Sequence, residues 1–258
     1  MKKPAPKITR KPVKRDNIVY GFHPVAEALT HSRPLEKILV RQGNTHERIK
    51  EIRELARTRQ IPVQTVPEEK ITQLCPDGVH QGVIAIMAAV AYRSLEQTIL
   101  EIQGRGEVPL LLMLDGITDV RNFGAIARTA ECMGVQAMIV PGQGAAPISA
   151  DAVKTSAGAL MHLPVCREEH LTDAILMLQA YDIAVVACTE KARDIIYDTD
   201  LSGPLCIIVG AEDKGISPSL LKRAGRLVAI PMVGNIESLN VSVAAGMILS
   251  EAVRQRRA

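Results

Sequence analysis

The chain has 258 residues, of which 47% are hydrophobic and 23% charged, and its formal net charge is +3 at neutral pH. This length allows two hydrophobic cores, and no apolar run approaches the roughly 18 residues that a membrane span requires. The five cysteines are scattered and the six histidines lack metal-ligand spacing. We therefore expect free thiols, no metal site and a cytoplasmic protein of two domains.

The first sixteen residues differ from the rest of the chain. Residues 1–16 carry seven basic residues against a single acid, Asp16, and include three prolines. Clustered charge with little apolar content predicts a disordered basic arm. Such an arm either neutralises RNA phosphates or only improves solubility, and both alternatives stay open here.

Residues 17–92 are expected to form a small α/β domain. Short β runs alternate with helices in this segment. The strands are expected at 38–40, 61–63 and 83–90, and the helices at 45–59 and after Pro67. Residues 93–108 are interpreted as a linker that contains a helix over 94–105 and ends in a polar, glycine-rich boundary.

From residue 109 the pattern changes to longer apolar strands that alternate with helices. The strands are expected near 109–114, 136–140, 183–188, 204–209 and 226–230. Apolar strands separated by helices are typical of a parallel sheet that is covered on both faces. The segment 109–258 is therefore predicted to be a second, larger α/β domain.

The first polar motif of this domain follows its first strand. The strand ends at Asp115, a loop carries Asp119, Arg121 and Asn122, and an alanine-rich helix then carries Arg128. A single arginine here would usually be a solvated surface residue. Because Arg121 and Arg128 are seven apart they share a helix face, and two guanidinium groups beside Asn122 can hold a phosphate. Ligands of open α/β sheets bind at such strand ends.

Two further polar motifs follow later strands. One strand ends at Gly210 and enters a loop with Glu212 and Gly215, and these glycines permit a close approach between backbone and ligand. The last strand is followed by a loop that brings Ser238 and Asn240 to the start of an apolar helix. An isolated Ser or Asn at this place usually only caps the helix, but here the free N–H groups and side-chain oxygens can also form a ligand site.

Together, three segments resemble, in order and spacing, the motifs of the SpoU (TrmH) branch of the SPOUT RNA methyltransferases. They are 114–130, 205–217 and 230–246. Residues 20–29 and 80–83 also look like the small RNA-binding domain of that family. The resemblance implies a parallel-sheet SPOUT domain with a trefoil knot, a rare exception to unknotted topology, and an N-terminal α/β domain similar to ribosomal protein L30e.

The resemblance also implies a set of functional residues. Five polar residues would form the active site: Asn122, Arg128, Glu212, Ser238 and Asn240. The cofactor S-adenosylmethionine would be held by Gly210, Ile230 and Leu239, together with Ser238 and Asn240. The family usually has glycine at the position of Asp213, a mild departure because aspartate tolerates turn conformations.

The implied activity is 2'-O-methylation of a ribose, that of a guanosine in large-subunit 23S ribosomal RNA, by a homodimer. Transfer RNA is the alternative substrate, and a non-catalytic RNA-binding protein of ribosome assembly is the alternative class. Arg128 would organise the site, but a guanidinium is always protonated and is not a simple general base. The proton acceptor stays open between a substrate phosphate and a water held by Glu212, and Glu212 could instead only bind backbone N–H groups of its own loop.

Overall fold

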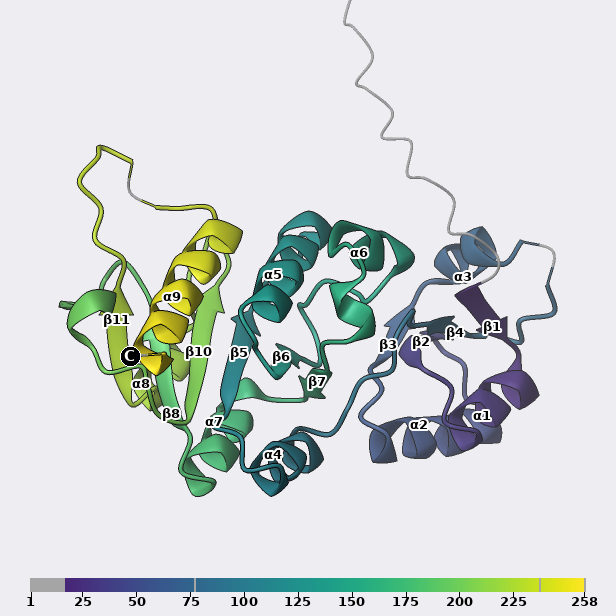
Figure 1. Ribbon diagram of the computed structural model, residues 1–258. Helices are drawn as coiled ribbons and strands as arrows, with labels where there is room; N and C mark the ends of the chain where they lie inside the picture. The colour runs from purple at the N-terminus through teal and green to yellow at the C-terminus, as the bar shows by residue number, and fades with distance from the viewer. Residues whose placement is uncertain (1–16, 77, 237, 258) are drawn as a thin grey trace, which may run out of the picture. The chain divides into compact units, whose positions relative to one another are not determined.

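The computed structural model describes residues 17–76, 78–236 and 238–257, so the basic segment 1–16 lies outside the described residues. The chain forms two compact units that divide between Met87 and Ala88 (Figure 1). No helix in these described ranges has both the length and the apolar character needed to cross a membrane.

The N-terminal unit is built on a four-stranded mixed sheet. Its strands have the order β1-β4-β2-β3, with β1 at Ile18–Tyr20, β2 at Leu35–Arg41, β3 at Val63–Val66 and β4 at Val83–Met87. Helices α1 (Phe22–Thr30) and α2 (Glu47–Thr58) share one hydrophobic core with the sheet. Helix α3 (Glu68–Leu74) closes a smaller core through Ile71. The unit has the expected mixture of helices and strands, with β1 and α1 as additional elements. It ends at Met87 and not at residue 92, because the strand expected at 83–90 ends at Met87.

Helix α2 shows why this unit folds as it does. Its buried residues Ile49, Ile52 and Ala56 recur at intervals of three and four, which places them on one face of the helix. The intervening residues are mainly charged. The strand expected at 61–63 begins only at Val63, because Pro62 has no N–H to donate; its carbonyl accepts a hydrogen bond from Ile38.

The C-terminal unit contains a seven-stranded sheet in the order β7-β6-β5-β10-β8-β11-β9. All its neighbouring strands run parallel. The five predicted strands are β5 (Leu110–Asp115), β6 (Ala137–Pro141), β8 (Ala184–Cys188), β10 (Leu205–Gly210) and β11 (Arg226–Ala229). The two edge strands, β7 (Val165–Glu168) and β9 (Asp194–Ile195), were not predicted. Both are short, and β7 ends in two charged residues that interrupt its apolar run.

Helices cover both faces of this sheet (Figure 1). One core contains residues of α5 (Val120–Cys132), α6 (Ala150–Thr155) and α9 (Val241–Arg256). The opposite core contains residues of α4 (Leu95–Gly104), α7 (Leu171–Ala180) and α8 (Pro218–Arg223). Strand β5 serves both, because Leu112 faces the first core and Met113 the second. The predicted parallel sheet covered on both faces is confirmed.

The segment expected to link the two domains belongs to the C-terminal unit. The helix predicted over 94–105 is α4, and Ser94 caps it by accepting a hydrogen bond from the backbone N–H of Gln97. Leu95, Ile99 and Ile102 of α4 are fully buried against the sheet. Residues 93–108 are therefore not a free linker, because this apolar face is needed to cover one side of the sheet.

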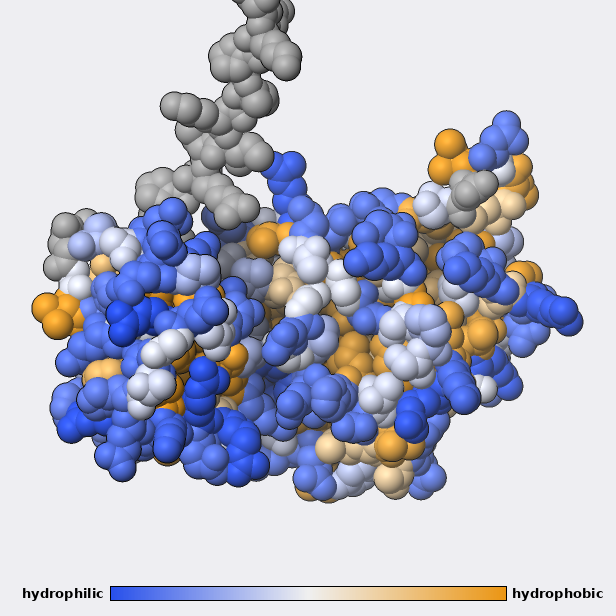
Figure 2. All heavy atoms as spheres, turned by 180° about the vertical axis from the view of Figure 1, so that it is seen from behind, coloured by the Kyte–Doolittle hydropathy of each residue, from blue (hydrophilic) through white to orange (hydrophobic). Residues whose placement is uncertain are grey.

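The loop between β11 and α9 projects from the C-terminal unit and mixes apolar with polar side chains (Figure 2). Val233 and Ile236 are strongly exposed there, and Met232 is partly so. This loop leads from the end of β11 to the first turn of α9, so it connects two of the elements that form the candidate site.

Candidate active site

The candidate site lies where the strand order of the C-terminal sheet changes direction. After β5 the chain passes through α5 to β6 on one side, whereas β10, the other neighbour of β5, leads through α8 to β11 on the opposite side. Connections that leave neighbouring parallel strands in opposite directions open a crevice beyond their carboxyl ends. The first two polar motifs follow β5 and β10 and therefore border this crevice.

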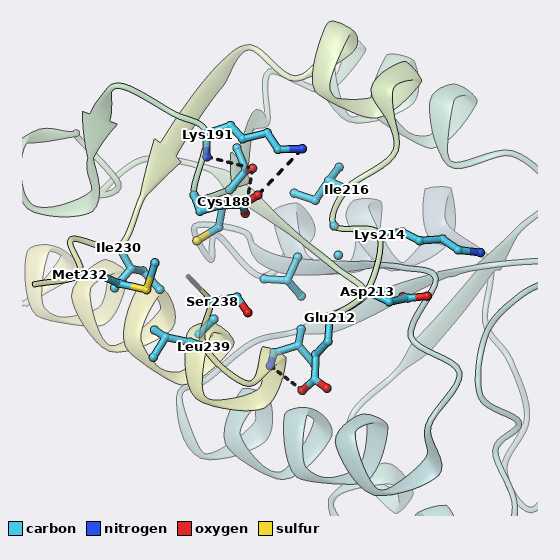
Figure 3. A pocket seen from close by; sticks show the side chains of 18 residues that line it. Cys188, Lys191, Glu212, Asp213, Lys214, Ile216, Ile230, Met232, Ser238 and Leu239 are labelled. Atoms are coloured by element: carbon cyan, nitrogen blue, oxygen red, sulfur yellow. Dashed lines mark hydrogen bonds and ion pairs between the residues drawn. The ribbon is translucent and has the colours of Figure 1, made fainter. Parts of the chain in front are cut away.

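Three predicted site residues meet there through their side chains. Asn122 donates a hydrogen bond to the Glu212 carboxylate, with 3.3 Å between Nδ2 and Oε1. The side-chain amide of Asn240 donates to Glu212 Oε1 and also to Asn122 Oδ1 at 3.1 Å. Glu212 further accepts the backbone N–H of Val241 at 3.2 Å, the bond that is drawn in Figure 3. One carboxylate thus joins the three motifs.

Helix caps position the two asparagines. Asp119 is the N-cap of α5 and accepts hydrogen bonds from the backbone N–H groups of Arg121 and Asn122, both at 2.9 Å. Asn240 is the N-cap of α9 and accepts from the N–H of Ser242 at 3.0 Å. An N-cap bond satisfies a free helix donor and fixes the start of the helix. Because only the Oδ1 atom of Asn240 accepts these bonds, its amide group remains available to bind Glu212 and Asn122.

The loop after β10 is held by its own backbone and by Asp115. The Asp115 carboxylate accepts the N–H of Ser217 at 2.7 Å, and its carbonyl accepts the N–H of Ala211 at 3.0 Å. A Cβ atom added to Gly210 would lie 2.2 Å from the backbone carbon of Gly215. Gly210 was expected to allow a close approach to a ligand. In the structure, the missing side chain first of all lets the backbone of Gly215 in the same loop pack against Gly210. This loop geometry aims Glu212 at the two asparagines.

A pocket opens beside this hydrogen-bonded set, over the carboxyl ends of β8, β10 and β11 (Figure 3). Its apolar lining includes Val209, Ile230, Met232 and Leu239. Its polar lining includes Glu212 and Ser238. All the predicted cofactor-binding residues except Asn240 thus border one pocket, and Asn240 adjoins it through Glu212.

Sequence reasoning missed one wall of this pocket, which residues 188–191 form after β8. Burial and the neighbouring Glu190 carboxylate raise the pKa of the Cys188 thiol to about 12, so the thiol is neutral at physiological pH. Lys191 Nζ lies 4.0 Å from Glu190 Oε1 in an exposed ion pair. A signal was present, since a polar Thr-Glu-Lys run follows a predicted strand just as the recognised motifs do.

Arg128 is the predicted site residue that does not join this set. It lies on α5 six residues after Asn122, about 9 Å farther along the helix axis. Its side chain is exposed, and it makes no hydrogen bond or ion pair with the described parts of the chain. Arg121, in the first turn of α5, is likewise exposed. The structure leaves both guanidinium groups open to a ligand from outside.

The fold and this site define an α/β protein with a pocket beside the switch point of a parallel sheet. Residues 109–250 match the model of the SpoU rRNA methylase family. Residues 18–93 match the model described as RNA 2'-O ribose methyltransferase substrate binding. The chain therefore belongs to the SpoU family of RNA methyltransferases, as its three motifs predicted.

Individual relatives cover nearly the whole chain. It is 38% identical over 240 residues to the 23S rRNA (guanosine-2'-O-)-methyltransferase RlmB of Haemophilus influenzae, covering 92% of this chain and 97% of RlmB. The structure of the SpoU methyltransferase AviRb from Streptomyces viridochromogenes with the cofactor AdoMet is 27% identical, with a TM-score of 0.59, and the match covers 93% of this chain and 90% of AviRb. The A. aeolicus TrmH/SpoU tRNA modifying enzyme is 28% identical with a TM-score of 0.53, and the match covers 63% of this chain and 84% of that enzyme.

Proposed function

We propose that this protein transfers the methyl group of S-adenosylmethionine to a ribose 2'-hydroxyl of RNA, and that its substrate is a guanosine of 23S ribosomal RNA. The observation that carries the proposal is the hydrogen-bonded set of Asn122, Glu212 and Asn240 at the mouth of a pocket in a SpoU-family fold.

The pocket suits a methyl donor of this kind. Its walls at Ile230 and Leu239 are apolar and fit an adenine ring, whereas Ser238 and Glu212 offer polar groups for the amino-acid end. The match to AviRb, whose structure contains AdoMet, supports the same assignment. When bound, S-adenosylmethionine supplies an already activated methyl group.

The protein has to align the ribose oxygen with this methyl group. Holding two reactants in an attacking geometry can contribute about 7–11 kcal/mol of barrier lowering. Glu212 fixes Asn122 and Asn240 relative to the start of α9, so their amide groups are already oriented before a ribose arrives. These residues are proposed to position the ribose and its hydroxyl.

Arg128 is proposed to hold the substrate phosphate next to the reacting ribose. Its exposed guanidinium stands on α5 beyond Asn122 and can bind a phosphate with two N–H groups. Because Arg128 stays protonated, the hydroxyl proton must go to another group. A phosphate oxygen held by Arg128 and a water held by Glu212 are both chemically suitable acceptors.

The N-terminal unit favours ribosomal RNA over transfer RNA. The match to RlmB spans 92% of the chain, whereas the match to the tRNA modifying enzyme spans 63%. Residues 18–93 match a substrate-binding model, which is consistent with a larger RNA. The trefoil knot at α9, the likeness of the N-terminal unit to ribosomal protein L30e and a homodimer are part of the same proposal, on the strength of the family resemblance.

The test is transfer of labelled methyl from S-adenosylmethionine to total RNA from a strain that lacks the protein, followed by mapping of the modified nucleotide. Label at the ribose of one 23S guanosine is the expected result. Label in transfer RNA would overturn the substrate assignment but keep the chemistry. Absence of label in RNA that the protein binds, with S-adenosylmethionine present, would overturn the proposed activity.

A further inference from the structure

We propose that the N-terminal unit has a phosphate-binding site for the RNA backbone, formed by His23 at the start of α1 and Arg48 at the start of α2. The inference rests on the proposed function, because it assumes that this unit binds the RNA substrate. It goes further by naming the side chains and the part of the RNA that they bind.

The site is defined by direct contact between the guanidinium of Arg48 and the imidazole of His23. Arg48 Nη1 lies 2.9 Å from His23 Nδ1 and also contacts His23 Nε2. Both side chains are exposed. A neutral imidazole can accept a hydrogen bond from the guanidinium, but it does not compensate its charge. No carboxylate pairs with Arg48 among the described residues.

Three other arginines of this unit are engaged differently. Arg41 forms an ion pair with Glu68 at 2.9 Å, and Arg57 forms one with Glu54 at 2.5 Å. Arg59 donates to backbone carbonyls, including that of Leu29 at 2.6 Å. The Arg48 guanidinium therefore lies against an imidazole instead of a carboxylate. An arrangement of this kind is completed by an anion from outside.

Neighbouring contacts hold this pair in a fixed position. His46, the N-cap of α2, accepts the backbone N–H of Arg48 at 3.3 Å. The ring of His46 stacks on Phe22, with 4.3 Å between ring centroids and 24° between ring planes. The backbone N–H of Phe22 in turn donates to Gln81 Oε1 at 2.9 Å. A preorganised site loses less conformational entropy when it binds its ligand.

The chemistry fits RNA. A guanidinium presents N–H groups in a planar fork that matches phosphate oxygens. Next to it the exposed His46 ring is stacked on Phe22 by one face, and its other face can stack on an unpaired base. An RNA loop offers both a phosphate and an unpaired base, whereas an acidic protein segment offers only the charge.

The proposal is tested with the full-length protein by measuring its affinity for a 23S ribosomal RNA transcript and for bulk transfer RNA between about 50 and 200 mM salt. Each phosphate contact contributes about 0.7–0.9 to the slope of log K against log salt concentration. Arg48→Ala should reduce the slope by about this amount for both RNAs. His23→Ala should also weaken RNA binding and reduce the slope, because it removes the group that positions Arg48. Arg48→Lys should preserve most of the slope.

Arg57→Ala is the matched control, because it removes one positive charge from the same helix outside the proposed site. For Arg57→Ala, the slope of log K against log salt concentration should equal that of the unaltered protein. If all three alanine variants flatten the slope equally, or if none does, the site is refuted. Thermal unfolding checks each variant, and Arg48→Gln replaces Arg48→Ala if that variant does not fold. Failure of methyl transfer with a changed slope would refute the proposed activity and leave this site standing.

Discussion

Glu212, which follows β10, accepts a hydrogen bond directly from the side-chain amide of Asn240, the N-cap residue of α9. The two residues come from separate motifs. Glu212 does not bind only N–H groups of its own loop, which was the alternative expectation. Its partners are the side chains of Asn122 and Asn240 and the backbone of Val241. Glu212 therefore serves to join the motifs.

Asn240→Ala should affect stability and methyl transfer to different degrees. Loss of the cap should lower the free energy of unfolding by about 0.5–2 kcal/mol. Loss of the bonds to Glu212 and Asn122 should reduce transfer by about 100-fold, because small displacements of positioning groups are costly. Ser94→Ala removes the cap of α4, on the opposite face of the sheet, and is the control. Denaturation and single-turnover transfer should show similar destabilisation in both variants but loss of activity in Asn240→Ala alone.

Glu212→Ala should leave the fold intact while reducing transfer at least about tenfold. The carboxylate is exposed, so its hydrogen bonds contribute little to stability, but without it the amide groups of Asn122 and Asn240 lose their common partner. Asp173→Ala removes an exposed acid from α7 on the other face of the sheet and should retain activity. Transfer assays at saturating S-adenosylmethionine would contradict this role if Glu212→Ala were as active as the control.

Arg128→Ala should reduce transfer by about 100- to 1000-fold, the usual effect of removing one charged donor from an active site. Binding of S-adenosylmethionine, followed by calorimetry, should be nearly unchanged because Arg128 does not border the pocket. Arg128→Lys keeps the charge but not the planar fork, so only part of the activity should return. Full activity of Arg128→Ala would remove this residue from the mechanism.

Glu251 on α9 should contribute to stability in a defined pH range. Hydrogen bonds from Arg254 and Gln255 lower the pKa of this buried carboxyl from 4.5 to about 2. A lowered pKa stabilises the folded protein above the unfolded pKa, and this contribution is lost as the pH falls from 4.5 to about 2. Glu251→Gln should therefore show a weaker dependence of unfolding temperature on pH across this interval. An identical dependence in both proteins would contradict the assignment.

Arg256 should anchor the end of α9 to the segments that directly precede β5 and β10. Its guanidinium donates to the carbonyls of Val108 at 3.2 Å, Pro109 at 2.8 Å and Gly203 at 2.6 Å. Arg256→Ala leaves these carbonyls without their donor and should cost about 2–3 kcal/mol of unfolding free energy in urea denaturation. Arg257→Ala, at the exposed neighbouring position, should change stability by less than about 0.5 kcal/mol. Equal effects of the two substitutions would exclude the anchoring role.

The helices and strands were predictable wherever a single segment shows a clear hydrophobic pattern. The long apolar strands β5 and β10, and the amphipathic helix α2, have clear periodicity and were predicted near their observed bounds. The edge strands β7 and β9 were missed because their few residues gain strand structure only by pairing with β6 and β11. The role of 93–108 was misjudged for a related reason, since only the assembled sheet shows that α4 is needed to cover it.

The candidate site likewise has features that local sequence predicts and contacts that it does not. Residue patterns alone were enough to predict that polar motifs follow three strands and that these motifs are those of the SpoU family, because strand ends, helix caps and glycines are local features. Which side chains meet depends on the folded chain, because Asn122 contacts Glu212, 90 positions away in the sequence, and Asn240, 118 positions away. It also placed residues 188–191 in the pocket wall and left Arg128 outside the hydrogen-bonded set. These contacts depend on the order β5-β10-β8 in the sheet, and strand order is set by the packing of the whole core, which local periodicity does not encode.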